Sequence, residues 1–483
     1  MYRSRTPRPM GQAPRPGHAC TACAQHRPVE WPSMKMLRAL VLLLVASLPP
    51  LVPAATEAPS PAEAASAPPV VSLSARKVYE QARSQLLQIR TVLKGRASQT
   101  SVGSGFIVTR EGHIITNFHV VSEAALEPAT HDLVYVTADG REARLDILML
   151  DVLHDLALLK PAATGDGKSA LPGWDVLGFR PAKDSLAQGE RMYSLGNPLD
   201  VGFAVIEGNY NGMVERSFYP QIFFSGALSG GMSGGPALDQ EGRVLGINVA
   251  RRVDGEQVSF LVPAAYAQQL LERGRNAPPM QGPADKEITR QLMEHQAVLT
   301  ERFIGQGWKT ATHPRYKVPV PPDRFMRCWG SSEQSRTGGL DFERSDCVMD
   351  TRIFVGKFTT GALSVRHESY DGSKLGTLRF AARHSQSFRN ENFRRLPAEH
   401  MTKPQCHEDF IERDKLPMRA VVCMRAYKKL PQLYDVAVLV ATLDQNQAGV
   451  QGRFDAQGVS FANAMKLTQH YLDAYGLHPE AEK

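Results

Sequence analysis

The chain has 483 residues, enough for two or more domains, each with a hydrophobic core of its own. Its formal net charge of +7 would suit a protein that binds nucleic acid, but the charge is unevenly spread. Residues 1–54 hold seven basic side chains and one acidic side chain, so the remainder carries a net charge of only +1. This near-neutral remainder gives no electrostatic reason to expect nucleic acid as a partner.

The first 54 residues have the pattern of a leader followed by a signal peptide. Residues 34–38 contain two basic side chains, Lys35 and Arg38, residues 39–48 form a short apolar core, and prolines and small residues follow up to Ala54. The apolar stretch is short for a membrane span, so we expect export to the periplasm or the medium. An uncleaved anchor is the alternative, and only then is membrane contact expected. Translation is expected to begin at Met34 or Met36.

Residues 55–74 are rich in alanine and proline and are expected to be a flexible linker. Residues 75–275 then show short β-type runs separated by turns, which is typical of a sandwich or barrel. The expected strands are 103–109, 113–117, 133–137, 143–150, 156–160, 192–195 and 243–249. Residues 263–273 are expected to form a closing helix.

A second region follows a proline-containing linker at residues 276–285. Ile288, Leu292, Leu299 and Phe303 recur at helical spacing, which predicts a helix that packs on a neighbouring domain. Further strands are expected at 352–355, 362–367, 376–381, 420–425 and 434–442. A last helix is expected between Ser460 as its N-cap and Gly476 just past its end. Residues 286–483 are therefore expected to form a smaller α+β domain.

Six cysteines divide into two groups. Cys20 and Cys23 lie in the leader and have no second pair with which to bind zinc. The other four, Cys328, Cys347, Cys406 and Cys423, favour two disulfides in an exported chain. Three pairings are open; we prefer the sequence-local pairs Cys328–Cys347 and Cys406–Cys423, with a metal site as the lesser alternative.

Three polar residues, each in a distinctive run, stand out in the first of these regions. His119 lies in Thr-Asn-Phe-His-Val-Val, Asp155 precedes Leu-Ala-Leu-Leu, and Ser233 lies in Gly-Gly-Met-Ser-Gly-Gly-Pro. Each alone has a structural interpretation: a core histidine, a loop aspartate and a turn serine. Together they follow the chain order His…Asp…Ser of chymotrypsin-type proteases. Asp151 is the alternative acid, and His154 is a nearby histidine without a predicted role.

These residue types suit one another chemically. A serine hydroxyl needs an adjacent base to act as a nucleophile, a role for His119. Asp155 would hold the imidazole in the correct tautomer. The glycines beside Ser233 permit a tight turn that presents the backbone N–H groups of Gly231 and Ser233 to a developing oxyanion. No metal or cofactor is expected.

Residues 100–272 resemble the protease domain of trypsin-like serine proteases of the HtrA/Deg type. The resemblance is carried by the runs 103–108, 116–121, 155–159, 196–198, 231–236, 244–248 and 260–263. It implies a mainly β fold, a chymotrypsin-like double β-barrel with the active site between the barrels, and endopeptidase activity without a metal. It also assigns the triad roles to His119, Asp155 and Ser233. The partners it implies are protein or peptide substrates and further copies of the chain.

The resemblance has two limits. Met232 stands where the family usually has asparagine, and no loop of the kind that opens a PDZ domain follows Asp285. In addition, Ala227 occupies the position at which a trypsin-specific pocket carries an acid, so a preference for Lys or Arg is not expected. Leu228, Ile247 and Val249 are expected to give an apolar pocket wall with Ala227. Small or medium aliphatic substrate residues are therefore predicted on the acyl side.

The sequence thus predicts an exported serine endopeptidase, in envelope protein quality control or processing. A chaperone-like binding protein on a protease fold is the first alternative. A non-proteolytic acyl hydrolase is less compatible, because α/β-hydrolases place their triad in the order Ser…Asp…His.

Overall fold

The structure is a computed structural model that describes residues 72–96, 98–163, 175–251, 258–322, 324–334, 340–388, 393 and 396–478. The leader, the signal segment and nearly all of the expected flexible linker lie outside these ranges. Residues from Val70 onward belong to one compact unit. Within the described ranges, no helix is both long and apolar enough to cross a membrane.

The first part of this unit is a closed antiparallel β-barrel, preceded by the helix α1 (Leu73–Ala82). Around the barrel the strands follow the order β1 (Leu86–Leu93), β2 (Gln99–Ile107), β3 (Ile114–Thr116), β6 (Leu156–Pro161), β5 (Glu142–Asp151) and β4 (His131–Thr137). A helix that the sequence did not predict, α2 (Phe118–Leu126), follows β3. The buried side chains of α2 pack with those of the strands in one core.

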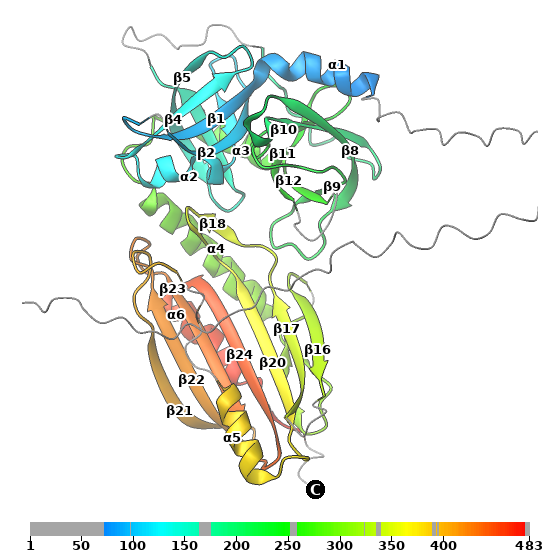
Figure 1. The fold of residues 1–483 in the computed structure, drawn as a ribbon, viewed down its shortest axis with the longest axis vertical. Helices are drawn as coiled ribbons and strands as arrows, with labels where there is room; N and C mark the ends of the chain where they lie inside the picture. The colour runs from blue at the N-terminus through cyan, green and yellow to red at the C-terminus, as the bar shows by residue number, and fades with distance from the viewer. Residues whose placement is uncertain are drawn as a thin grey trace, which may run out of the picture. The chain divides into compact units, whose positions relative to one another are not determined.

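A second closed barrel follows, as Figure 1 shows in green. Its strands follow the order β10 (Pro236–Leu238), β11 (Val244–Arg251), β12 (Ser259–Pro263), β9 (Ile222–Phe224), β8 (Ala204–Met213) and β7 (Arg191–Gly196). The short 3-10 turn η2 (Pro198–Asp200) lies between β7 and β8, and the helix α3 (Ala264–Gly274) closes this part. The predicted chymotrypsin-like double barrel is confirmed.

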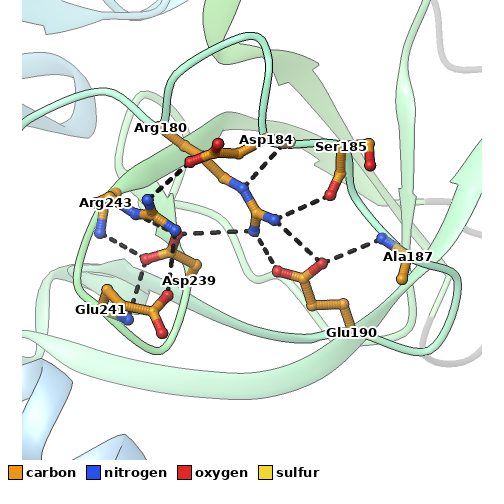
Figure 2. Close-up of polar contacts among 8 residues, drawn as sticks. All are labelled: Arg180, Asp184, Ser185, Ala187, Glu190, Asp239, Glu241 and Arg243. Atoms are coloured by element: carbon orange, nitrogen blue, oxygen red, sulfur yellow. Dashed lines mark hydrogen bonds and ion pairs between the residues drawn. The ribbon is translucent and has the colours of Figure 1, made fainter.

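A network of charges fastens the segment before β7 to the β10–β11 turn (Figure 2). Arg180 forms an ion pair with Glu190, and its Nη1 lies 3.7 Å from the carboxylate of Asp239. Arg243 donates to Asp239 at 2.8 Å and to Asp184 at 3.0 Å. Because Asp239 is 1% exposed, its charge requires these partners. The network therefore holds together two loops of the second barrel that are far apart in sequence.

The remaining residues form a seven-stranded antiparallel sheet with helices on both faces (Figure 1). Its strands follow the order β16 (Arg327–Glu333), β17 (Asp341–Val348), β20 (Leu363–Asp371), β24 (Ala448–Val459), β23 (Tyr434–Thr442), β22 (Leu416–Ala426) and β21 (Gln405–Arg413). The helices α4 (Asp285–Gly305) and α6 (Phe461–Leu472) cover one face, and α5 (Thr377–Ser387) lies on the other. The predicted α+β part after the barrels is thus present.

Shorter strand pairs complete this region: β13 (Lys309–Thr310) with β15 (Pro319–Val320), and β14 (Tyr316–Lys317) with β25 (Gly476–Leu477). A hairpin of β18 (Ile353–Val355) and β19 (Phe358–Thr360) extends between β17 and β20. The structure joins Cys328 to Cys347 and Cys406 to Cys423, the pairs preferred from the sequence. Each disulfide links directly opposed residues of neighbouring strands.

Two element predictions need correction. The expected strand at 376–381 was wrong, because α5 begins there after Gly376, whose φ of 74° favours glycine. The last helix does start at Ser460, whose side chain accepts a hydrogen bond from the Asn463 N–H. It ends at Leu472 rather than near Gly476, which instead pairs with Lys317 in a short ladder.

The helix α4 belongs to two hydrophobic cores at once. Ile288 and Leu292 pack in the core of the first barrel, whereas Leu299 and Phe303 pack beneath the seven-stranded sheet. Next to Leu292, the Gln291 side chain accepts from the Val152 N–H at 2.8 Å and donates to the Leu150 carbonyl at 2.8 Å. The apolar stripe predicted from the sequence is therefore one of the contacts between the sheet region and the first barrel.

Candidate active site

His119 and Asp155 form a close hydrogen-bonded pair at the start of α2. The Asp155 Oδ2 lies 2.6 Å from His119 Nδ1, and its Oδ1 accepts from the His119 backbone N–H at 2.8 Å. The carboxylate thus fixes both the position and the tautomer of the ring, leaving Nε2 to face a substrate. Burial alone would lower the pKa of His119, but the charge of Asp155 and the hydrogen bond to it raise that pKa.

The backbone of Asp155 is held in an unusual conformation. Its φ of 55° lies in the left-handed region, which costs energy for a residue with a side chain. Two donors compensate, because the Asp155 carbonyl accepts from the Phe118 N–H at 3.1 Å and from Asn117 Nδ2 at 2.8 Å. Strain of this kind at a positioned carboxylate is typical of functional sites.

Asp151, the alternative acid, is occupied elsewhere. Its carboxylate lies 3.0 Å from the His154 Nδ1 and 3.4 Å from Arg273 Nη2. The pKa of Asp151 is lowered: burial opposes this direction, but hydrogen bonding and charge from His154 outweigh it. The structure therefore brings Asp155, rather than Asp151, to His119.

The loop that carries Ser233 packs tightly between the two barrels. A Cβ on Gly234 would lie 2.2 Å from the Ser104 carbonyl oxygen, and one on Gly235 would lie 2.1 Å from the Leu195 carbonyl oxygen. Gly231 and Gly234 also have positive φ values, 89° and 84°. Glycine is thus required here both by conformation and by space.

The loop of Ser233 contacts the segment before His119, since a Cβ on Gly234 would lie 2.9 Å from the Asn117 nitrogen, but the Ser233 hydroxyl does not bond to His119. Its Oγ donates instead to the Val249 carbonyl at 3.1 Å. The register between β11 and β12 shifts between Asn248 and Ala250, so Val249 lies at a bulge. A rotation about χ1 of Ser233 would free the hydroxyl from this carbonyl, and loose geometry of this kind is common before substrate binds.

The expected oxyanion donors are free of backbone partners. Within the described residues, neither the Gly231 N–H nor the Ser233 N–H donates to another backbone group. The Gly230 carbonyl accepts from the Leu199 N–H at 2.8 Å, which fixes the plane of the Gly230–Gly231 peptide. Unpaired, oriented N–H groups beside a nucleophile are what stabilisation of an oxyanion requires.

The four residues expected to line a specificity pocket are distributed differently. Leu228 is 4% exposed in one hydrophobic core, and Ile247 is fully buried in another. Ala227 is exposed, and Val249 lines a cavity of about 460 Å³. Val249, two residues further along β11, lies at the bulge and packs against the same core as Ile247 while remaining partly exposed. The aliphatic preference expected from these four residues stays a prediction.

Two buried side chains that hold this site were not predicted from the sequence. Ser104 Oγ donates to the Gly231 carbonyl at 2.7 Å and accepts from the Asn197 N–H at 2.9 Å. Asn248 Nδ2 donates to the Met232 carbonyl at 3.2 Å. Their only sequence signal was a polar residue inside a run expected to be a strand. Among the described residues, no group of three His, Cys, Asp or Glu side chains could hold a metal ion.

A cavity of about 460 Å³ borders the site. Both barrels line it, through residues that include Val152, Asp155 and Val249, and so does the β17–β18 region with Thr351 and Phe354. Its volume lies within the range of small-ligand pockets, roughly 300–1,000 Å³. The sequence did not predict that residues beyond 286 would contribute to this site.

Comparison with known proteins gives matches to the barrel region. Residues 103–247 match the family described as the trypsin-like peptidase domain. The chain is 30% identical over 182 residues to the putative serine protease HhoB of Synechocystis, covering 36% of this chain and 40% of that protein. It is 31% identical over 183 residues to a probable periplasmic serine endoprotease, DegP-like, of Halomonas elongata, covering 36% and 35%.

Among solved structures, the serine endoprotease from Yersinia pestis is similar at 24% identity and a TM-score of 0.35, over 43% of this chain and 68% of that chain. The chain spans about two fifths of the length of the HhoB relative and about a third of the DegP-like one.

Proposed function

We propose that the chain, whose residues 103–247 form a trypsin-like peptidase domain of the HtrA type, is a serine endopeptidase that acts through Ser233, His119 and Asp155. The observation that carries the proposal is the His119–Asp155 pair beside a glycine-rich loop that presents Ser233. The matches to proteases support it independently. The sequence resemblance itself is confirmed for the barrel region.

The proposed mechanism follows from these positions. Substrate binding turns the Ser233 hydroxyl from Val249 towards His119 Nε2, which accepts its proton as the oxygen attacks the scissile carbonyl. Asp155 stabilises the resulting imidazolium, and the Gly231 and Ser233 N–H groups bind the oxyanion. His119 then protonates the leaving amine, and water attacks the acyl-enzyme by the same steps in reverse.

A binding protein on a protease fold is the second candidate. The observation in its favour is the bond from Ser233 Oγ to Val249 instead of to His119. The two candidates differ in the reactivity of Ser233, since only an activated serine reacts rapidly with a fluorophosphonate. The order of the triad residues along the chain disfavours an α/β-hydrolase esterase.

We also infer that the protein acts in the cell envelope, on misfolded or partner proteins. The signal-like residues 34–54, the two disulfides and the similarity to relatives named periplasmic support this location. The inference on location is independent of the chemistry and is tested by fractionation of cells that produce the protein.

One experiment tests the chemistry. The protein and its Ser233→Ala variant are incubated with unfolded casein, and fragments are followed by gel electrophoresis. We expect cleavage by the parent chain and a loss of at least about 10⁴-fold in the variant. Ser101→Ala, in β2, is the matched control and should cleave as the parent does. Equal cleavage by the parent chain and Ser233→Ala would contradict the proposal.

A further inference from the structure

The hairpin β18–β19 lies against α2, the helix whose second residue is the candidate base His119. Ile353, Val355 and Phe358 are 2%, 3% and 7% exposed and share a hydrophobic core with residues of α2. At the hairpin turn, a Cβ on Gly356 would lie 2.8 Å from Leu126 Cδ1, so this turn packs closely on α2. The hairpin is therefore fixed relative to His119 by a buried apolar contact.

Phe354 of this hairpin packs against the same core but is only partly buried by it. Because side chains alternate along a strand, Phe354 points away from the face on which Ile353 and Val355 are buried. Its ring lies 6.0 Å from the His119 ring and 6.4 Å from the Phe118 ring, both in edge geometry. It is only half-buried and lines the cavity of about 460 Å³.

The residues that line the cavity suit the binding of one side chain of a substrate, because most of them are apolar. Val152, Val249 and Phe260 from the barrels line the cavity together with Phe354, and so does Asp155 of the candidate triad. Asp350 and Arg352 add charged groups to a lining that is otherwise mainly apolar. Val249 also lies at the bulge of β11, next to Ser233. An extended peptide bound along such a bulge could place one of its side chains in the apolar cavity while its backbone reaches the nucleophile.

The loop before β9 is held to the same region. The Phe218 N–H donates to Thr351 Oγ1 at 3.1 Å, and the Tyr219 hydroxyl lies 2.7 Å from His295 Nδ1 on α4. Thr351 and Tyr219 both line the cavity. Hydrogen bonds therefore join the barrel loop to the segment that leads into β18, in addition to the apolar contacts of the hairpin. The residues that line the cavity are held in place by these contacts.

We propose that Phe354 is a specificity-determining residue, with which the C-terminal region completes the substrate cleft and selects an apolar substrate side chain close to the scissile bond. This rests on the proposed endopeptidase function and deepens it. The occupant is one aliphatic or aromatic side chain of an extended polypeptide, because most of the lining is apolar and its two aspartates are engaged, Asp155 by His119 and Asp350 by Arg327. Phe354 contacts the substrate and takes no part in proton transfer.

The test compares the full chain with Phe354→Ala and Phe354→Leu on a library of fluorogenic peptides that vary one position at a time. We expect the parent chain to prefer apolar residues at one position beside the cleaved bond. In Phe354→Ala, kcat/KM for the apolar peptides should fall about tenfold, with peptides polar at that position nearly unchanged. Phe354→Leu should keep most of the preference. Phe410→Ala, at an exposed position of β21, should behave as the parent.

Reaction of Ser233 with a small fluorophosphonate supplies the second measurement, because this probe does not need the cavity. Its rate should change less than twofold in Phe354→Ala, while thermal unfolding shows that the variant folds. An equal loss for all peptides and for the probe would make Phe354 a support for His119 and overturn the proposal. An unchanged profile, or faster cleavage of every peptide, would also overturn it. If the parent chain cleaves nothing and does not react with the probe, the endopeptidase function itself fails, and this inference with it.

Discussion

In the candidate site, the Asp155 side chain directly controls the protonation of His119. Asp155 acts on it twice, by its charge and by the hydrogen bond to Nδ1, and these effects exceed the opposite effect of burial. The pKa of His119 is therefore raised above its ordinary value of about 6.5. A general base must be neutral to accept the Ser233 proton, so activity should be lost as pH falls through this raised pKa.

This gives a prediction for Asp155→Asn. The substitution removes both effects that raise the pKa of His119 and leaves burial, so the acid limb of kcat/KM should move to lower pH. At pH 8 the rate should also fall by about 10⁴-fold, because the amide no longer holds the productive tautomer. The measurement is the rate of fluorophosphonate labelling between pH 5 and 9 at high protein concentration.

Asp151→Asn is the control for this prediction, since Asp151 bonds to His154 and Arg273 rather than to His119. Its acid limb should coincide with that of the parent chain. If Asp155→Asn also kept the parent midpoint, the carboxylate would not be what raises the pKa of His119.

At the scale of secondary-structure elements, α4 links the first barrel to the seven-stranded sheet. Its first half is buried with the first barrel and its second half with the sheet. Gln291, 5% exposed, stands at the contact with the barrel and satisfies one backbone donor and one backbone acceptor of residues 150–152. Loss of its amide would leave both buried groups unpaired.

We expect Gln291→Ala to destabilise the chain by about 2 kcal/mol and to weaken the link between barrel and sheet. Urea unfolding, followed by far-ultraviolet circular dichroism and by tryptophan fluorescence, should then give two transitions that no longer coincide. Gln268→Ala, at an exposed position of α3, is the matched control and should change stability by less than about 0.5 kcal/mol. Coincident transitions with an unchanged midpoint in Gln291→Ala would contradict this role of α4.

Elements and site residues differ in how far the sequence predicted them, and the reason is the range of the interactions involved. Ser233, His119 and Asp155 lie in contiguous runs, so local pattern was sufficient to choose them. The helix α5 was mistaken for a strand because the apolar residues at its start resemble a β-run, and only the sheet beneath decides its form. Ser104 and Phe354 became visible only in three dimensions, since each contacts residues more than a hundred positions away.

At the scale of the whole molecule, buried histidines of the described residues make stability depend on pH, and three of them have the pKa lowered to about 4. His295 in α4, His367 in β20 and His384 in α5 are 1%, 5% and 9% exposed. Burial lowers the pKa of each to about 4, although for His295 and His367 a hydrogen bond to a backbone carbonyl opposes the shift. All three lie in the part of the chain after the barrels. In the first barrel, burial also lowers the pKa of His113, which is 2% exposed.

The sign of the effect follows from the unfolded state, in which each histidine has a pKa of about 6.5. Between about pH 6.5 and 4 the unfolded chain binds protons that the folded chain does not, so stability is lost as pH falls through this window. Each histidine contributes up to about 1.4 kcal/mol per pH unit. Between pH 6.5 and 5 ordinary carboxylates stay charged, so histidines dominate the change.

His295→Gln tests this at one position. Glutamine offers an N–H for the Gly361 carbonyl and an oxygen for the Tyr219 hydroxyl, the two groups that His295 contacts at 2.8 and 2.7 Å, but it does not titrate. Between pH 6.5 and 5 the variant should therefore lose about 2 kcal/mol less stability than the parent chain, as measured by urea unfolding at each pH. His407→Gln, at an exposed position of β21, should follow the parent, because water solvates that ring in both states. Equal slopes for all three proteins would mean that the pocket around His295 accepts the proton without cost, and the acid response would then have to arise from His367, His384 or the ion pairs.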